Sequence, residues 1–279
     1  MALRPDAKPH IFDAGVRAVE AALERRGMEG TVEEIPDIWR GNYRVRLRHG
    51  VDEPAVVRVE DPSRYRDVVN AALATCDREH LVVLGTGVEP VASDTYQELA
   101  AWLDQPGIAG VTGRVLSSGG FVQHAGMVRR PGGEPLLPCC GFRADDPGYG
   151  AMAVNIRNVS LLHPMACAWR VDALRAIGGL PTAFEGAYAI LDASVEAERA
   201  GHRLLYNPLA TFESDDPMLQ PAMWGEAERD LFAERRRDAI EHDLHFHWAF
   251  DRSHVDMRLG LGAPDYVFDV DLHRSEAAT

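Results

Sequence analysis

The stretch AVVRVEDPSRYRDVVNAALATCDREHLVVLG, residues 55–85, decides the fold. Residues 56–59 and 81–84 are apolar runs of strand length. Between them, Asp61 can cap a helix that carries Pro62 in its first turn, and apolar residues then recur at helical spacing. A strand, a helix and a second strand in this order predict a βαβ unit, in which the strands lie parallel and the crossover is right-handed.

The residues before this unit predict a small N-terminal lobe. Residues 11–26 place apolar side chains near one helical face, and Gly27 is suited to end that helix. Residues 31–35 and 42–48 are strand-like, and a turn-rich stretch separates them. We therefore expect a helix and a β-hairpin within residues 1–52.

The residues after the unit continue the alternation of helices and strands. They predict helices at 93–104, 172–177, 189–200 and 222–242, and strands at 109–116, 159–169 and 203–206. A polar stretch rich in Gly and Pro, residues 117–150, is long enough to form a functional surface. The fold class that follows is α/β, with a mixed sheet flanked by helices in a core of residues 53–258 and a tail of residues 259–279.

Composition and charge restrict the function classes. The chain of 279 residues has 29 basic and 43 acidic residues, a net charge of −14, which disfavours the phosphate contacts that dominate nucleic-acid binding. No apolar run reaches the length of a membrane span, and the N-terminus lacks the basic-then-apolar order of a signal peptide. We expect a cytoplasmic protein with no membrane span and no nucleic-acid partner.

Cysteines and histidines give no metal motif of recognised spacing. The four cysteines are Cys76, Cys139, Cys140 and Cys167, and none of them lies in a CxxC pair. Four histidines gather in residues 242–254, where His242 and His245 would share a helical face. We expect packed thiols, no metal and no cofactor, and the sequence leaves the role of this histidine-rich segment open.

Five stretches carry a resemblance to a known family. They are EHLVVLGTGVEP (79–90), GGFVQHAG (119–126), DDPGYGAMAVNIRNVS (145–160), DALRAIGGLPTAF (172–184) and EAERAGHRLLYNP (196–208). From Val57 to about Ser214 the chain resembles the later part of a family 2 glycosyltransferase with the GT-A fold, and the N-terminal helix and hairpin are similar to elements that precede the catalytic domain in some members. The resemblance implies a reduced, GT-A-like (Rossmann-like) mixed sheet.

The donor half that the resemblance implies is incomplete. Family members open with two further strands that bind the nucleotide base, and here the hairpin near Arg48 leads almost directly to residue 56. The family's metal-binding acidic motif follows the strand that corresponds to residues 81–84, where this chain has Gly85, Thr86 and Gly87. Because a divalent cation on the nucleotide phosphates needs carboxylate ligands, these residues cannot replace the motif.

The acceptor half also departs from the family pattern. Alignment on EAERAGHR puts Ile190 at the usual catalytic base and leaves Asp192 as the second acid of the pair. An isoleucine cannot take the proton of an attacking hydroxyl. The short stretch 211–214 replaces a histidine-rich turn, and His163 with its two following residues stands where a small, Gly-containing segment is usual.

Some polar residues remain as candidates for a site in the former acceptor cleft. Asp192 and His163 are the candidate catalytic residues, although Asp192 is also suited to bind backbone N–H groups of a helix. The candidate ligand-binding residues are His124, Arg157, Asn158 and Glu185. An alternative of equal weight is that His124, Arg157 and Asn158 only hold loops in place by hydrogen bonds.

Three functions agree with this pattern. The first is a pseudoenzyme that binds a small molecule or glycan, or acts as a scaffold, without sugar transfer. The second is a repurposed enzyme of a specialised biosynthetic pathway, and the third is a glycosyltransferase that is metal-independent or completed by a partner chain. Because missing strands leave residues 81–84 or the neighbouring strand at a sheet edge, we also expect a homodimer or a partner protein at that edge.

Overall fold

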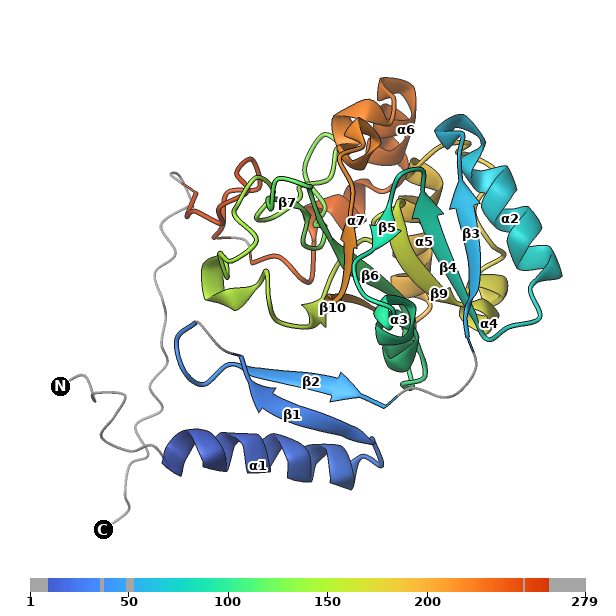
Figure 1. Cartoon of the computed structure of the whole chain (residues 1–279). Coiled ribbons are helices and arrows are strands. Elements are labelled where there is room, and N and C mark those ends of the chain that lie inside the picture. Colours follow the sequence, from blue (N-terminus) through green and yellow to red (C-terminus); the bar gives the residue numbers. More distant parts are fainter. Residues whose placement is uncertain (1–9, 36–37, 49–52, 248, 261–279) are drawn as a thin grey trace, which may run out of the picture.

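The computed structural model describes residues 10–35, 38–48, 53–247 and 249–260. Its centre is a mixed β-sheet of eight strands with helices on both faces, so the expected α/β class is confirmed (Figure 1). The expected tail at 259–279 lies almost entirely outside the described residues. Among the described residues, no helix is both long and apolar enough to cross a membrane.

The βαβ unit forms as the sequence predicts. Strands β3 (Ala55–Val59) and β4 (His80–Gly85) pair in parallel. The 3₁₀ helix η2 (Pro62–Arg64) and the helix α2 (Tyr65–Thr75) connect them. The Asp61 carboxylate caps this connection by accepting a hydrogen bond from the Ser63 N–H at 3.0 Å.

The sheet has the strand order β3-β4-β9-β6-β10-β5. The strands that follow β4 in this order are β9 (Ala166–Arg170), β6 (Ile108–Leu116), β10 (Arg203–Glu213) and β5 (Glu89–Pro90). Strand β10 is parallel to β6, whereas β9 is antiparallel to both of its neighbours. Two short strands, β7 (Val122–His124) and β8 (Arg157–Asn158), pair with β6 and β10 respectively.

Helices cover the two faces of the sheet through alternating side chains of β4. Leu81 and Val83 pack in a core with α2, α4 (Val171–Ala176) and α5 (Tyr188–Arg199). Val82 and Leu84 pack on the opposite face against α3 (Thr95–Leu103). Since both faces are buried, the apolar run of this strand has no polar alternation.

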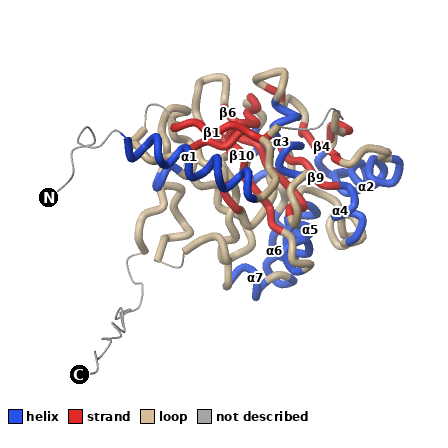
Figure 2. The backbone as a smooth tube through the Cα atoms, turned by 90° about the horizontal axis from the view of Figure 1, so that it is seen from below, coloured by secondary structure: helices blue, strands red, loops and turns tan. Residues whose placement is uncertain are grey.

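The N-terminal lobe consists of α1 (His10–Arg25) and the antiparallel strands β1 (Gly30–Glu34) and β2 (Tyr43–Leu47). It lies on the α3 side of the sheet (Figure 1), and Figure 2 shows α1 and β1 from below. Leu23 and Leu47 form a small apolar cluster with Ala101 of α3. Arg46 adds ion pairs to Asp94 at 3.0 Å and Glu98 at 2.6 Å, so apolar and charged contacts both hold the lobe to the core.

The expectation that residues 81–84 or the neighbouring strand lie at a sheet edge is met by the neighbouring strand β3, since β9 pairs with the other side of β4. Two other expectations about single elements need correction. The expected strand 159–169 forms only from residue 166 on, as part of β9, because the chain leaves the sheet around His163 and Pro164; the short strand β8 precedes the expected range. The expected helix 222–242 is broken into η5 (Pro221–Met223), α6 (Glu226–Arg235) and α7 (Arg237–Glu241).

Candidate functional site

The end of β4, where the resemblance places a metal motif, is packed with side chains. Gly85 lies against Met165, and a Cβ atom on Gly85 would meet the Met165 Sδ at 2.4 Å. The Thr86 hydroxyl donates to the Val59 carbonyl at 3.3 Å, and the Glu89 carboxylate pairs with Arg58 at 2.9 Å. Residues 85–87 therefore close the strand end without offering a carboxylate to a cation.

Two of the candidate residues, His124 and His163, form a buried pair. Both side chains are fully buried, and their ring centroids are 4.4 Å apart. The His163 Nε2–H donates to the Leu219 carbonyl at 3.0 Å, and its Nδ1 accepts from the Met165 N–H at 3.1 Å. With both nitrogens bonded to backbone in this way, His163 is neutral, and burial lowers its pKa to about 4.

His124 is less completely satisfied than its neighbour. Its Nε2 lies 3.0 Å from the Thr112 hydroxyl oxygen, whereas its Nδ1 has no hydrogen-bond partner among the described residues. Burial, and then the adjacent His163 and Arg157, holds the pKa of His124 well below its usual value. Both imidazoles are thus uncharged at neutral pH and closed off from solvent, so the arrangement offers no exposed base.

The third candidate, Asp192, is the centre of a buried ion-pair cluster. Its carboxylate is fully buried and accepts hydrogen bonds from Arg236 Nη2 at 2.7 Å and from Arg235 Nε at 3.2 Å. A third bond comes from Arg236 Nε, and the same guanidinium also pairs with Glu196. The Asp192 carboxylate therefore joins α5 to the break between α6 and α7, and it bonds to arginines of that segment.

The remaining three candidates lie in two other places. The Glu185 side chain is exposed, and its backbone N–H donates to the Glu228 carboxylate at 2.6 Å. Arg157 bonds to the Ala125 carbonyl at 2.6 Å and to the Met152 carbonyl at 3.2 Å, with its guanidinium 5.3 Å from the Tyr206 ring. Asn158 is exposed next to it in β8.

The six candidate residues are therefore spread over four surroundings: the buried histidine pair, the Asp192 cluster, the exposed loop at Glu185, and β8 with Arg157 and Asn158. The Arg157 guanidinium packs against Gly126, since a Cβ atom on Gly126 would meet an Arg157 nitrogen at 2.5 Å. The catalytic and binding roles of the six stay predictions.

The structure contains a groove of about 930 Å³ between the lobe and the core, which we call the lobe groove. The sequence patterns did not predict it. Its apolar lining comes from α1, β2, α3, β6 and β10 and includes Val19, Tyr43, Trp102, Ile108 and Leu205. Arg157 and Asn158 also line it, together with Arg26 and Arg203.

No local motif marks the lobe groove, because its walls come from residues far apart in the chain. Arg26 follows α1, Trp102 lies in α3, and Arg203 begins β10. The sequence signal that was available is the pair Arg157 and Asn158, which the comparison with the family motif singled out. The two residues were expected in an acceptor cleft, and the structure puts them in the wall of this groove.

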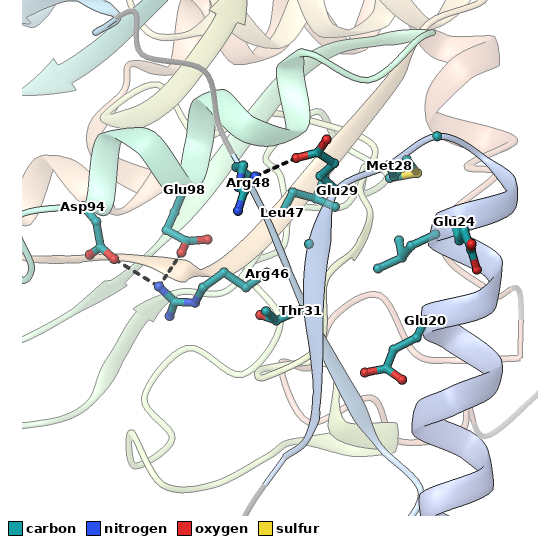
Figure 3. Close-up of a pocket in the computed structure, with 13 residues that line it drawn as sticks. Glu20, Glu24, Met28, Glu29, Thr31, Arg46, Leu47, Arg48, Asp94 and Glu98 are labelled. Carbon is teal, nitrogen blue, oxygen red and sulfur yellow. Dashed lines mark hydrogen bonds and ion pairs between the residues drawn. The ribbon is translucent and has the colours of Figure 1, made fainter.

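A second groove, of about 780 Å³, lies between α1, the hairpin and α3, and its character is acidic (Figure 3). Its lining includes Glu20 and Glu24 on α1. The Arg48 guanidinium pairs with Glu29 at 2.9 Å, and Arg46 pairs with Asp94 and Glu98. Its arginines are therefore neutralised by carboxylates within the same groove.

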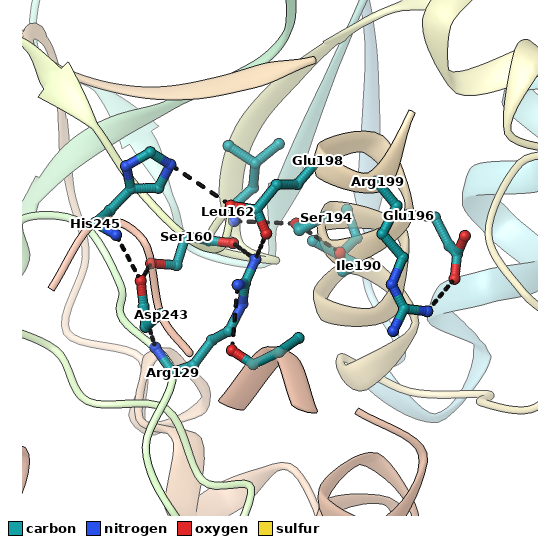
Figure 4. Close-up of polar contacts among 11 residues, drawn as sticks. Arg129, Ser160, Leu162, Ile190, Ser194, Glu196, Glu198, Arg199, Asp243 and His245 are labelled. Atoms are coloured by element: carbon teal, nitrogen blue, oxygen red, sulfur yellow. Dashed lines mark hydrogen bonds and ion pairs between the residues drawn. The ribbon is translucent and has the colours of Figure 1, made fainter. Parts of the chain in front are cut away.

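A buried polar network brings Ser160, Asp243 and His245 together without forming a catalytic triad (Figure 4). The Ser160 hydroxyl donates to Asp243 Oδ1 at 2.5 Å, and the His245 backbone N–H donates to the same oxygen at 2.9 Å. The His245 Nε2 instead lies 3.7 Å from Glu198, which also pairs with the buried Arg129. Since the imidazole does not contact the serine, it cannot activate it, and the network fastens residues 243–245 to the core.

The histidine-rich segment shows separate contacts in its described part. His242 lies 3.3 Å from Asp238, and His254 lies 2.7 Å from Asp251. The one group of three possible metal ligands among the described residues is elsewhere and comprises Glu79, His80 and Asp104. Because His80 already pairs with Asp104 at 3.2 Å and cationic Arg170 is close, we assign no metal to this group.

The cysteines are free thiols with unreactive surroundings. Cys139 and Cys167 are buried, and Cys76 and Cys140 are half-buried. Burial raises the pKa of Cys139 to about 11 and also raises that of Cys140. Since the thiolate is the nucleophile, both are poor nucleophiles at neutral pH.

Comparison with known proteins gives one relative and two similar folds. No family model matches the chain. The uncharacterised protein y4gI of Sinorhizobium fredii (strain NBRC 101917 / NGR234) is 26% identical over 156 residues, which are 56% of this chain and 17% of that protein. This chain therefore corresponds to a small part of y4gI.

Two solved glycosyltransferase structures are similar over about half of the chain. The mannosyltransferase PcManGT from Pyrobaculum calidifontis, in complex with GDP-Man and Mn²⁺, has a TM-score of 0.36 and 18% identity over 55% of this chain and 36% of its own. GalNAc-T7 with UDP, GalNAc and Mn²⁺ has a TM-score of 0.41 and 9% identity over 53% of this chain and 30% of its own.

Proposed function

We propose that this chain is a binding protein with a glycosyltransferase-like fold and that it does not transfer sugars by the metal-dependent route. The observation that carries the proposal is the state of Asp192, the remaining acid of the expected catalytic pair. Its carboxylate is fully buried and bonded to Arg235 and Arg236. A buried carboxylate that is bonded to two guanidiniums is not free to contact the hydroxyl of a sugar acceptor, as a catalytic base must.

Two further observations support the same proposal. Met165 packs against Gly85 at the strand end where a metal motif is expected, and no carboxylate is present in residues 85–87. Ile190 is fully buried in the core, so nothing at the expected position of the base reaches a substrate. These observations concern two separate parts of the expected site, and each supports the proposal.

A hydrolysis assay tests the proposal directly. Metal-dependent transferases release nucleotide from their donor sugars, so the full chain with manganese and UDP-, GDP- or dTDP-sugars should give no release above the protein-free rate. The matched control is Asp192→Asn, used once circular dichroism shows that it is folded, because any trace activity from a contaminant should be the same in both preparations. Release that depends on manganese and falls in the folded Asp192→Asn variant would overturn the proposal.

A transferase completed by another polypeptide is the second candidate, and one observation favours it. The edge strand β3 has no neighbour on its outer side among the described residues, and Val56 in it is exposed. Missing donor strands from another chain would add to the sheet at this edge, and so would β3 of a second copy. We propose that β3 pairs with a strand of another chain, and that this other chain is first of all a second copy of the same protein.

A further inference from the structure

We propose that the lobe groove binds a small amphipathic anion, a molecule with a flat apolar body and one carboxylate, sulfonate or phosphate group. The inference extends the proposed function, because it states where such a binding protein would hold its ligand and of which chemical class. Its volume of about 930 Å³ is in the range of small-molecule sites, roughly 300–1,000 Å³.

The apolar body of the ligand would lie between the lobe and the core. Val19 and Ala22 of α1 and Val45 of β2 line the lobe side, and Ile108 and Leu205 line the core side. These side chains come from four different elements that the folded chain brings to one place. Burial of apolar ligand surface in such a lining favours binding, but it does not fix the orientation of the ligand.

Aromatic and polar groups in the groove can orient a flat ligand. Trp102 lines the groove, and its indole Nε1–H has no hydrogen-bond partner among the described residues. Tyr43 offers a second ring on the lobe side. The Asn155 amide donates to Asn42 at 3.2 Å and ties the core to the lobe within the same lining. A flat ligand is suited to stacking on such rings.

The charge of the lining decides the sign of the ligand. Arg26, Arg157 and Arg203 line the groove, and no Asp or Glu does, although the whole chain has 43 acidic and 29 basic residues. No ion pair joins any of these three guanidiniums to an acidic residue in the described part of the chain. An anion would supply the charge that the protein itself does not.

The arginines of the second, acidic groove, which lies between α1, the hairpin and α3, differ from those of the lobe groove. In the acidic groove, Arg46 and Arg48 are both paired with carboxylates. Carboxylates thus neutralise the arginines of one groove, whereas in the lobe groove Arg26 and Arg157 bond to backbone carbonyls and no carboxylate of the described residues neutralises them. Because Arg26 belongs to the lobe side and Arg203 to the core, one anion bound near both would also fasten the lobe to the core.

A fluorescence titration of the full chain without metal tests this site. The probe is anilinonaphthalenesulfonate, a flat aromatic anion, and its uncharged counterpart N-phenyl-naphthylamine measures the apolar contribution alone. We expect one bound sulfonate probe per chain and weaker binding of the neutral probe. Arg203→Gln and Arg26→Gln should each weaken the sulfonate by about tenfold, the usual scale of one charge-assisted hydrogen bond, and leave the neutral probe unchanged.

Two further variants keep the test decisive. Arg17→Gln changes an exposed arginine on α1 that does not line the groove, and it should leave both probes unaffected. Ala22→Phe fills the lobe side and should abolish binding of both probes, with circular dichroism to confirm that the variant is folded. Equal loss in Arg17→Gln and Arg203→Gln, or equal binding of the two probes by the native chain, would overturn the inference. Neither result bears on the separate proposal that the chain does not transfer sugars.

Discussion

The Asp192 side chain is fully buried at the contact between α5 and the break that separates α6 from α7. In the sequence it stands where the family's second acid is expected, and in the structure its carboxylate is bonded to Arg236. Arg236 is itself buried at the break between α6 and α7. A buried carboxylate of this kind stabilises the fold because it neutralises a guanidinium that water cannot reach.

The first prediction at this scale concerns that ion pair. Asp192→Asn leaves the buried Arg236 charge without its main partner, and the free energy of unfolding should fall by about 3–5 kcal/mol in a urea titration. Asp172→Asn is the matched control, because its carboxylate pairs with Arg170 on the surface and is 74% exposed. The control should cost about 1 kcal/mol or less. Equal losses in the two variants would contradict the assignment.

The second prediction concerns the buried imidazole of His163. Its pKa is lowered to about 4, so the folded chain binds this proton less readily than the unfolded chain, whose histidines have a pKa of about 6.5. The stabilising contribution is therefore complete above pH 6.5 and is lost as the pH falls towards 4. His163→Gln should make the fall of unfolding free energy across this window shallower. The exposed His242→Gln should keep the native slope.

At the scale of elements, the regular part of the fold was predictable from local patterns. The βαβ unit, the hairpin and the helix at 189–200 each rest on periodicity and caps within one stretch of chain, and each is confirmed. The breaks were not predictable. The division at Arg236 depends on Asp192, a residue distant in sequence, and the chain's departure from the sheet at His163 depends on backbone bonds to Leu219 and Met165.

The third prediction concerns the packing of β4 beneath the segment before β9. Gly85→Ala places a methyl group 2.4 Å from the Met165 Sδ, and the buried methionine must move. We expect a loss of about 1–3 kcal/mol in thermal or urea unfolding, the usual scale of overpacking. Gly119→Ala is the control, since its new methyl would lie 3.4 Å from the Phe121 ring in ordinary contact. In a Met165→Ala background, Gly85→Ala should lower the free energy of unfolding by less than it does in the native chain. Absence of any loss in Gly85→Ala would show that this strand end is open.

At the scale of the whole molecule, the lobe and the core together create features that neither contains alone. The two grooves are lined from both parts, one acidic and one with unpaired arginines. Sequence patterns depend on residues that are close along the chain, so they predicted the elements of the lobe and of the core but not how the two pack together. They could not give the lobe groove, whose arginines at 26, 157 and 203 meet only after the lobe has packed on α3.

The fourth prediction concerns pairing along β3. The strand is at the sheet edge, and its Val56 side chain is 44% exposed. If a second copy covers this edge, light scattering at micromolar concentration should give the mass of a dimer, and Val56→Lys should give that of a monomer. Val91→Lys changes an equally apolar exposed residue beyond β5 and should leave the dimer intact. A monomeric native chain would contradict pairing between copies.

Isothermal titration calorimetry tests the proposal that this chain does not bind a donor sugar through a metal. The full chain is titrated with UDP-, GDP- and dTDP-sugars, with and without manganese. We expect no manganese-dependent heat and no metal-assisted binding tighter than millimolar. Weak binding that needs no metal and disappears in Ala22→Phe would belong to the lobe groove. Micromolar binding that requires manganese would contradict the proposal.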